Sequence, residues 1–279
     1  MSPAPFPFHV TLVPILRGNQ GRARKSGQGR PRCFFDGRGP CRPPPALYKP
    51  NQDALYWRLQ TGCGFKQDAS KSMKQPPLVI WDWNGTLLDD VDAGVQALNK
   101  MLVARHLPTI THDFYRAHFG FPVRPFYTLI GMDPDAEWER ICVEFHVNLH
   151  AARQGLRPDA RAALETVRAH GGRQVVLSAL REDLLLRDTA AAGVQAFFEA
   201  ICGVDDLSGA TKLARGHELL QHLAFTPSSA SRLLFIGDTL HDAEVATALG
   251  ATALLVEGGH QSTARLRTAG CPVVPALLD

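Results

Sequence analysis

Residues 77–90 read PLVIWDWNGTLLDD, and this stretch decides the fold. Leu78–Trp81 form a short apolar run, which is typical of a strand buried on both faces in a parallel sheet. The run ends in Asp82, and the polar turn Asn84–Thr86 follows two residues later. Ligands of open α/β sheets bind at the carboxyl ends of the strands. The stretch therefore predicts a functional carboxylate at the end of a buried strand.

The rest of the chain continues this strand with a regular alternation of elements. Nearly continuous apolar runs follow at 174–178 (QVVLS), 232–238 (RLLFIGD) and 253–258 (ALLVEG). Amphipathic helical segments lie near 159–170, 181–192, 211–223, 240–249 and 262–269. Several of them end at a glycine suited to a left-handed cap: Gly171, Gly193, Gly250 and Gly270. This alternation predicts an α/β fold with a doubly wound parallel sheet.

A helical insertion separates the first two apolar runs. Residues 92–156 have a helical pattern throughout. Because the insertion follows the first strand directly, we expect it to lie over the carboxyl end of that strand as a small cap, where it would cover a site. The predicted organisation is a core made of 73–91 and 157–279, with a helical cap at 92–156.

The first 72 residues differ in composition from the rest. They carry 12 Lys/Arg against 3 Asp/Glu, whereas the remainder carries 18 against 24, and they hold 10 of the 20 prolines and 8 of the 24 glycines. Such a segment predicts disorder. A nucleic-acid-binding arm and a transit peptide are alternatives. We favour the hypothesis that translation starts at Met73 and that 1–72 is an upstream extension, which N-terminal sequencing of the native protein would decide.

Composition also restricts the compartment and the partners. The mildly acidic remainder disfavours nucleic-acid binding by the folded part. The six cysteines show no metal-ligand spacing, which suits a reducing compartment. No stretch approaches the ~18–20 apolar residues that cross a bilayer. We expect a cytoplasmic protein with no membrane partner, and the sequence leaves its oligomeric state open.

Polar side chains end three of the apolar runs. Asp82, Ser178 and Asp238 follow the first three runs, and Lys212 begins the helix before the third. Each alone suits a turn, a cap or a solvated surface. Together they meet at one sheet edge, where two carboxylates can bind Mg²⁺, the backbone amides of the Asn84–Thr86 turn can face an anion, and Lys212 can bind phosphate. Asp82 could then attack phosphorus as a nucleophile.

These motifs resemble those of the haloacid dehalogenase superfamily, close to its phosphoglycolate-phosphatase-like branch with a helical cap. DWNGTLLDD is similar to the first motif, Asp-x-Asp-Gly-Thr-Leu, whose first aspartate is the nucleophile and a magnesium ligand. VVLSA is similar to the second motif through Ser178, and Lys212 corresponds to the third. GDTLHD resembles the fourth, with Asp238 as metal ligand and Asp242 supporting Lys212 or a metal-bound water.

The resemblance implies a Mg²⁺-dependent phosphatase that hydrolyses a small phosphorylated metabolite through an aspartyl-phosphate. It implies catalytic roles for Asp82, Asn84 and Lys212, substrate or phosphate binding by Gly85, Thr86, Ser178, Ala179, Lys212 and Arg124, and metal binding by Asp82, Asn84, Asp238 and Asp242. Arg124, in the cap segment FGFPVRPFYTLIG, would reach a second anionic group of the substrate, or else is a surface guanidinium. We expect His260 and Gln261 to cap a loop and a helix without touching the site.

Asn84 departs from the pattern of the superfamily. The aspartate usual at its position is the general acid/base, and an amide cannot exchange a proton near neutral pH. General acid–base help is worth ~10²–10⁴-fold. Four explanations stay open: a leaving group that needs no acid, a binding role for a catalytically weakened protein, deamidation of Asn84, or replacement by one of His241, Asp89, Asp90 and His118.

Overall fold

The computed structural model describes residues 76–152, 154–204, 212–227 and 232–279. The basic extension 1–72 and the start site predicted at Met73 therefore lie outside the described residues. In the described part, none of the helices has both the length and the apolar character that crossing a membrane requires. The cysteines there, Cys142, Cys202 and Cys271, are free thiols.

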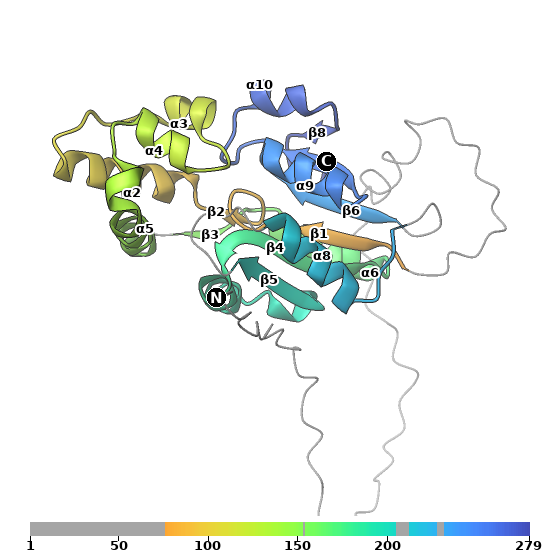
Figure 1. Ribbon diagram of the computed structural model, residues 1–279. Coiled ribbons are helices and arrows are strands. Elements are labelled where there is room, and N and C mark those ends of the chain that lie inside the picture. Colours follow the sequence, from red (N-terminus) through yellow and green to blue (C-terminus); the bar gives the residue numbers. More distant parts are fainter. Residues whose placement is uncertain (1–75, 153, 205–211, 228–231) are drawn as a thin grey trace, which may run out of the picture. The chain divides into compact units, whose positions relative to one another are not determined.

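Six parallel strands form the main sheet, in the order β5-β4-β1-β6-β7-β8 (Figure 1). Their bounds are β1 Leu78–Trp81, β4 Arg173–Arg181, β5 Ala200–Val204, β6 Leu233–Gly237, β7 Thr252–Val256 and β8 Val273–Val274. β1 pairs with β4 on one side and with β6 on the other. The predicted α/β fold with a doubly wound parallel sheet is confirmed.

The sequence pattern missed β5 and β8, which lie at the two edges of this sheet. β5 has the sequence AICGV and is buried along its whole length. A run of five residues that includes a glycine carries little periodic signal. Edge strands were therefore the part of the sheet that the pattern could not predict.

The helices of the core agree with the predicted segments to within one residue at each end, except that the last segment is divided into α10 and a 3₁₀ helix. They are α6 Ala160–Ala169, α7 Glu182–Ala191, α8 Lys212–His222, α9 Leu240–Ala248 and α10 Thr263–Leu266, with the short 3₁₀ helices η1 Gln195–Phe197 and η2 Arg267–Ala269. The four glycines predicted to end helices all have positive φ.

The side chains of β1 pack alternately on the two faces of the sheet. Ile80 joins a core cluster with Leu219 of α8 and with side chains of α9. Trp81 points to the opposite face, where its indole donates a hydrogen bond of 2.9 Å to Gln174. Gln174 in turn donates to the backbone oxygen of Leu164 in α6. Helices thus cover both faces, which is why β1 has an unbroken apolar sequence.

A small helical cap is present after the first strand, as predicted. Its helices are α2 Val91–Ala104, α3 His112–His118, α4 Arg124–Leu129 and α5 Pro134–Ala151, which form one group in Figure 1. They share an apolar core to which Leu98, Tyr115, Phe126 and Ile141 belong. The chain leaves the core through β2 (Leu88–Asp89) and returns through β3 (Gly155–Leu156), which pair antiparallel.

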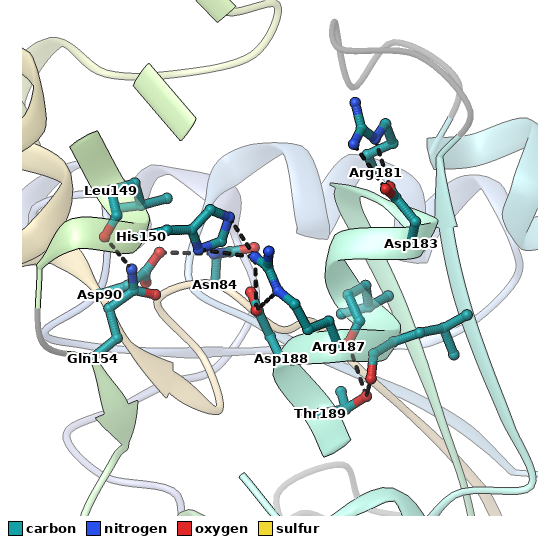
Figure 2. Close-up of polar contacts among 12 residues, drawn as sticks. Asn84, Asp90, Leu149, His150, Gln154, Arg181, Asp183, Arg187, Asp188 and Thr189 are labelled. Atoms are coloured by element: carbon teal, nitrogen blue, oxygen red, sulfur yellow. Dashed lines mark hydrogen bonds and ion pairs between the residues drawn. The ribbon is translucent and has the colours of Figure 1, made fainter. Parts of the chain in front are cut away.

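Polar contacts join the cap to the core at two places. Arg116 of α3 donates to the backbone oxygen of Gly259, in the loop after β7, at 3.1 Å. On α5, the imidazole of His150 accepts from Arg187 of α7, with 2.6 Å between Nε2 and Nη2 (Figure 2). The cap is therefore held over the carboxyl edge of the sheet from both sides.

Candidate active site

Three buried carboxylates meet at the carboxyl edge of the sheet. Asp82 follows β1, Asp238 follows the neighbouring β6, and Asp242 lies in the first turn of α9. Each offers an oxygen within 4.8 Å of those of the other two. The pairing of β1 with β6 brings Asp82 and Asp238 together although 156 positions separate them in the sequence.

Lys212 lies between two of these carboxylates. Its Nζ is 2.5 Å from Asp82 Oδ1 and 2.6 Å from Asp242 Oδ1, and its side chain is buried. Burial alone would lower the pKa of Lys212, but the two carboxylates outweigh it and raise the pKa. The lysine therefore stays charged and fixes the orientation of Asp82.

The start of α9 fixes Asp242. Thr239 and Asp242 form a capping box, in which Asp242 Oδ2 accepts from the Thr239 hydroxyl at 2.6 Å and from two backbone amides. Gly237, the last residue of β6, leaves room for this turn, since a Cβ there would lie 2.3 Å from the Cβ of Asp242. Asp242 thus has one oxygen committed to the helix cap and one to Lys212.

Asn84 is bound to a carboxylate that follows β2. Its amide donates to Asp90 Oδ2 at 2.7 Å (Figure 2), and the backbone amide of Gly85 donates to Asp90 Oδ1 at 2.8 Å. The amide of Gly85, expected to face a phosphate, is therefore already paired. A Cβ at Gly85, where φ is +74°, would lie 2.3 Å from Asp238 Oδ2, so this close approach accounts for the glycine.

His260 belongs to the site, which corrects the expectation that it only caps a loop. Its backbone amide donates to Asp238 Oδ2 at 2.6 Å, and its Nε2 lies 3.2 Å from Asp90 Oδ1. On the other side of the ring, Nδ1 lies 2.8 Å from the hydroxyl of Tyr115 in the cap. Burial lowers the pKa of His260, but Asp90 reverses this and raises it to about 9. Gln261, as expected, caps a helix: it accepts from the Leu240 amide at the start of α9.

Sequence reasoning missed this network because its members come from three distant segments. Asp90 ends the opening stretch, Tyr115 lies on α3, and His260 follows β7. The pair Asp89–Asp90 gave one signal, since Asp89 ends β2 whereas Asp90 precedes the first residue of α2. Asp90 is buried and Asp89 is exposed.

Ser178 and Ala179 line the same cavity as the carboxylates. Ser178 does not end its strand as predicted, because β4 continues to Arg181 with a register shift after Leu177. Such an irregularity re-aims a side chain. Thr86, expected to bind phosphate, instead donates toward Asp238 Oδ1 at 3.1 Å and Asp82 Oδ2 at 3.4 Å.

Arg124 is not among the described residues that line the cavity. Its guanidinium stacks on the ring of Trp138, 4.6 Å from the centroid, and lies 3.7 Å from Asp135. It is about half exposed. The structure therefore agrees with the surface alternative, because the aromatic ring offers the guanidinium a better partner than the site does.

Of the four groups considered as substitutes for the acid/base, Asp90 alone lines the cavity. His241 stacks on Phe121, His118 bonds to a backbone oxygen of its own helix, and Asp89 is exposed. Burial would raise the pKa of Asp90, but His260 and Asn84 outweigh it and hold the pKa below its usual range. Asp90 is therefore ionised, and it serves as an acceptor.

The carboxylate cluster suits a hard cation. Burial raises the pKa of Asp82 to about 8, against the effect of Lys212, and raises the pKa of Asp238 to about 6. Burial would also raise the pKa of Asp242, but Lys212 outweighs it and lowers that pKa. The three carboxylates face one lysine, so a divalent cation held by oxygen ligands would relieve the excess negative charge.

A cavity of about 140 Å³ opens from this cluster into the cap. Its inner end is polar, with Asp82, Ser178, Lys212 and Asp238. Side chains of α2, α3, α4 and α5 line the rest. The cap thus supplies most of the surface that a ligand would meet beyond the carboxylates.

The cluster of carboxylates and the cap lie within the region that a known protein family shares with this chain. The family model described as haloacid dehalogenase-like hydrolase matches residues 79–256, more than half of the chain. The chain belongs to the haloacid dehalogenase-like hydrolase family. The match includes the cap and all of the carboxylates described above. The predicted resemblance is confirmed.

Individual proteins resemble the chain to different degrees. Phosphoglycolate phosphatase from Caulobacter vibrioides is 28% identical over 190 residues, which cover 65% of this chain and 79% of that protein. Tyrosine-protein kinase PtkA from Mycobacterium tuberculosis is 27% identical over 197 residues, 69% of this chain and 66% of the kinase. The structure of that PtkA aligns with a TM-score of 0.58 at 26% identity and covers 68% of this chain and 88% of that chain.

A more distant structure shows the same fold. A haloacid dehalogenase-like family hydrolase from Streptococcus pneumoniae aligns with a TM-score of 0.60 at 16% identity, over 73% of this chain and 95% of the other. At this identity the likeness extends to the fold alone.

Proposed function

We propose that the chain is a Mg²⁺-dependent phosphatase that hydrolyses a small phosphorylated metabolite through an aspartyl-phosphate on Asp82. The observation that carries this proposal is the position of Asp82. Its carboxylate lies at the end of β1, is oriented by Lys212 at 2.5 Å, and opens onto a cavity lined by Ser178. A protein that merely bound phosphate would not need an oriented nucleophile.

Each residue of the site has a role in this reaction. Asp82 attacks phosphorus, while Lys212 and Ser178 bind phosphate oxygens and hold the phosphoryl group in line. Asp82, Asp238 and the backbone carbonyl of Asn84 would hold Mg²⁺, and Asp242 would keep Lys212 in place. When bound, Mg²⁺ would neutralise charge that develops on the phosphoryl oxygens. Water then releases phosphate from Asp82.

The named relatives support phosphoryl chemistry and leave the substrate open. One is a phosphoglycolate phosphatase and another is a tyrosine-protein kinase. The position of Arg124 on Trp138 gives no support to a second anionic group on the substrate. A cytoplasmic location and the lack of nucleic-acid or membrane partners stay predictions from the sequence.

A second function has one observation in its favour. The amide of Asn84 is committed to Asp90, so this position supplies no proton to a leaving group. A catalytically weakened protein that binds a phosphorylated ligand or partner would share all the other features of the site. Hydrolysis of a phosphate ester or acyl phosphate is expected of the phosphatase and not of the binding protein.

The test is a panel of phosphate monoesters and acyl phosphates, assayed with and without Mg²⁺. We expect metal-dependent turnover by the wild type and none by Asp82→Asn. The matched control is Asp89→Asn, which makes the same change in the same stretch at an exposed position and should keep full activity. Trapping a fluoride-based phosphate mimic on Asp82 checks the nucleophile separately. If the wild type turns over no member of the panel, the binding function replaces the phosphatase.

A further inference from the structure

The part of the cavity inside the cap is an aromatic chamber. We call it the cap chamber, and its walls include Phe119, Phe121, Phe126, Tyr127, Trp138 and Phe145. These rings come from α4, α5 and the segment between α3 and α4. The chamber is continuous with the carboxylate cluster, so a molecule whose phosphate reaches Asp82 places its remaining atoms against these rings. A phosphorylated metabolite of two or three carbons would leave most of this surface without a contact.

Gly94 keeps the chamber open on the side of α2. It is buried and lines the cavity, yet a Cβ added there would meet no described heavy atom within 4 Å. A glycine inside a helix is destabilising by about 0.5–1 kcal/mol relative to alanine. The open space beside Gly94 belongs to the cavity. Gly94 has no positive φ, so its backbone conformation does not require a glycine. The open space beside it therefore explains the glycine better.

The cap chamber carries no group that would favour a charged ligand. None of its described lining residues beyond the carboxylate end is Lys or Arg. Burial lowers the pKa of His146, which keeps its ring neutral, and raises the pKa of the Cys142 thiol to about 11. An engineered apolar cavity of about 150 Å³ in another protein takes up benzene. The whole cavity, with its carboxylate end included, has a similar volume of about 140 Å³, so its apolar part has room for no more than one aromatic ring.

The position of Asn84 gives an independent reason for the same ligand. A leaving alkoxide needs a proton from a general acid, and the amide of Asn84, bonded to Asp90, has none to give. A phenol ionises near pH ~10, so a phenoxide departs without that proton. The residue at position 84 and the lining of the cap chamber thus favour the same class of leaving group.

We infer that the cap chamber binds the ring of a small aryl phosphate and that the protein hydrolyses aryl phosphates in preference to alkyl phosphates. This inference rests on the proposed phosphatase function and names its substrate class. An oxygen of Asp82 bonds to phosphorus while the bond from phosphorus to the aryl oxygen breaks. The phenoxide leaves with the electron pair and takes a proton from solvent. Water then bonds to phosphorus, the bond to Asp82 breaks, and both protons of the water leave on dihydrogen phosphate.

Binding of two phosphonates tests the chamber without turnover. Phenylphosphonate and methylphosphonate share the anionic group and differ in the ring. By calorimetry in the presence of Mg²⁺, we expect the wild type to bind phenylphosphonate at least about tenfold more tightly, since burying a ring of this size is worth that much or more. We expect Gly94→Leu, whose side chain fills the chamber, to remove most of this preference. Gln96→Leu adds the same side chain at an exposed position of α2 and should keep the preference.

The outcomes separate this inference from the function on which it rests. Equal affinity of the wild type for the two phosphonates overturns the inference, and so does a preference that survives Gly94→Leu. If Gly94→Leu does not fold, the comparison in the wild type decides. Turnover of acetyl phosphate without a preference for phenyl phosphate over ethyl phosphate leaves a phosphatase with another substrate. If the phosphonates bind as expected but nothing is turned over, the chamber is an aryl-phosphate binding site and the phosphatase proposal fails.

Discussion

Asn84 and Asp90 are best understood as a pair. A second aspartate at position 84 would place two carboxylates 2.7 Å apart, where Asn84 now donates a hydrogen bond. Two carboxylates that share a site cannot both ionise easily, so one pKa would rise. The asparagine removes this conflict and leaves Asp90 ionised beside His260. The cost is the loss of a proton donor in front of the leaving group.

We therefore predict that Asn84→Asp creates a general acid. The shared proton would sit on the carboxyl pair near neutral pH, and turnover of an alkyl phosphate should rise by about 10²-fold, the lower end of what general acids contribute. Turnover of an aryl phosphate should change far less, because its leaving group needs no proton. The kcat values for ethyl phosphate and phenyl phosphate measure this directly. Asn84→Ser, which supplies no acid, serves as the control, and an equal gain on both esters would contradict the explanation.

At the scale of elements, the turn from β6 into α9 determines the geometry of the site. Between Gly237 and Asp242 it ends a central strand, supplies Asp238, caps a helix through Thr239 and positions Asp242. The turn is tight enough that the atoms of Asp242 occupy the place of a side chain at Gly237. One element boundary thus orients two of the three carboxylates.

We predict that Gly237→Ala destabilises the protein by about 1–3 kcal/mol, the usual cost of overpacking a buried position. The added methyl group would displace Asp242 and with it Lys212, so kcat should fall as well. Urea unfolding monitored by circular dichroism gives the free energy of unfolding. Gly155→Ala is the matched control, because a Cβ there meets no described atom within 4 Å, and its effect should stay within about 0.5 kcal/mol. Similar losses in the two variants would refute the role of the tight turn.

At the scale of the whole molecule, packing the cap on the core buries charge. His260, Asp90 and Tyr115 meet where α3 faces the loop after β7. Arg116 and Arg265 of the same region donate to backbone oxygens across that junction. The carboxylate cluster below is buried by the same arrangement, so the stability of the protein without metal depends on protonation.

We predict that the metal-free protein loses stability as the pH rises from about 6 to about 9. Burial raises the pKa of Asp82 from 3.8 to about 8, so the folded state keeps a proton that the unfolded chain has released, and stability falls through this range. Burial lowers the pKa of His260, but Asp90 raises it to about 9. The stability from the His260 charge is therefore complete below 6.5 and lost as the pH rises through 9. Both groups therefore lower the stability of the folded protein as the pH rises.

Melting temperatures in EDTA across this range measure the effect, at about 2–4 °C for each kcal/mol. Saturating Mg²⁺ should flatten the profile, because the cation binds the ionised carboxylates and stabilises the folded state most at high pH. Asp82→Asn should remove the part of this pH dependence that comes from the Asp82 carboxyl. A melting temperature that rises with pH in EDTA would show that the carboxylate cluster does not control stability.

The sequence by itself determined the four inner strands of the sheet, the helices that cover it, the presence of a cap and the members of the carboxylate cluster. The physical reason is that these features are local. A strand buried on both faces has an unbroken apolar run, and β1, β4 and β6 each show one. Parallel pairing then brings the ends of these strands together, so the sequence alone predicted that Asp82, Ser178 and Asp238 lie at one edge of the sheet.

Only the tertiary structure decided which partners these residues have. Four features form only in the folded chain: the bond from Asn84 to Asp90, the bond from the His260 backbone amide to Asp238, the stacking of Arg124 on Trp138 and the cap chamber. They depend on how turns, loops and cap helices pack, and packing selects one among many chemically reasonable partners. The sequence therefore determined where the carboxylate cluster lies, and the fold of the cap decided the size and lining of the cavity beside it.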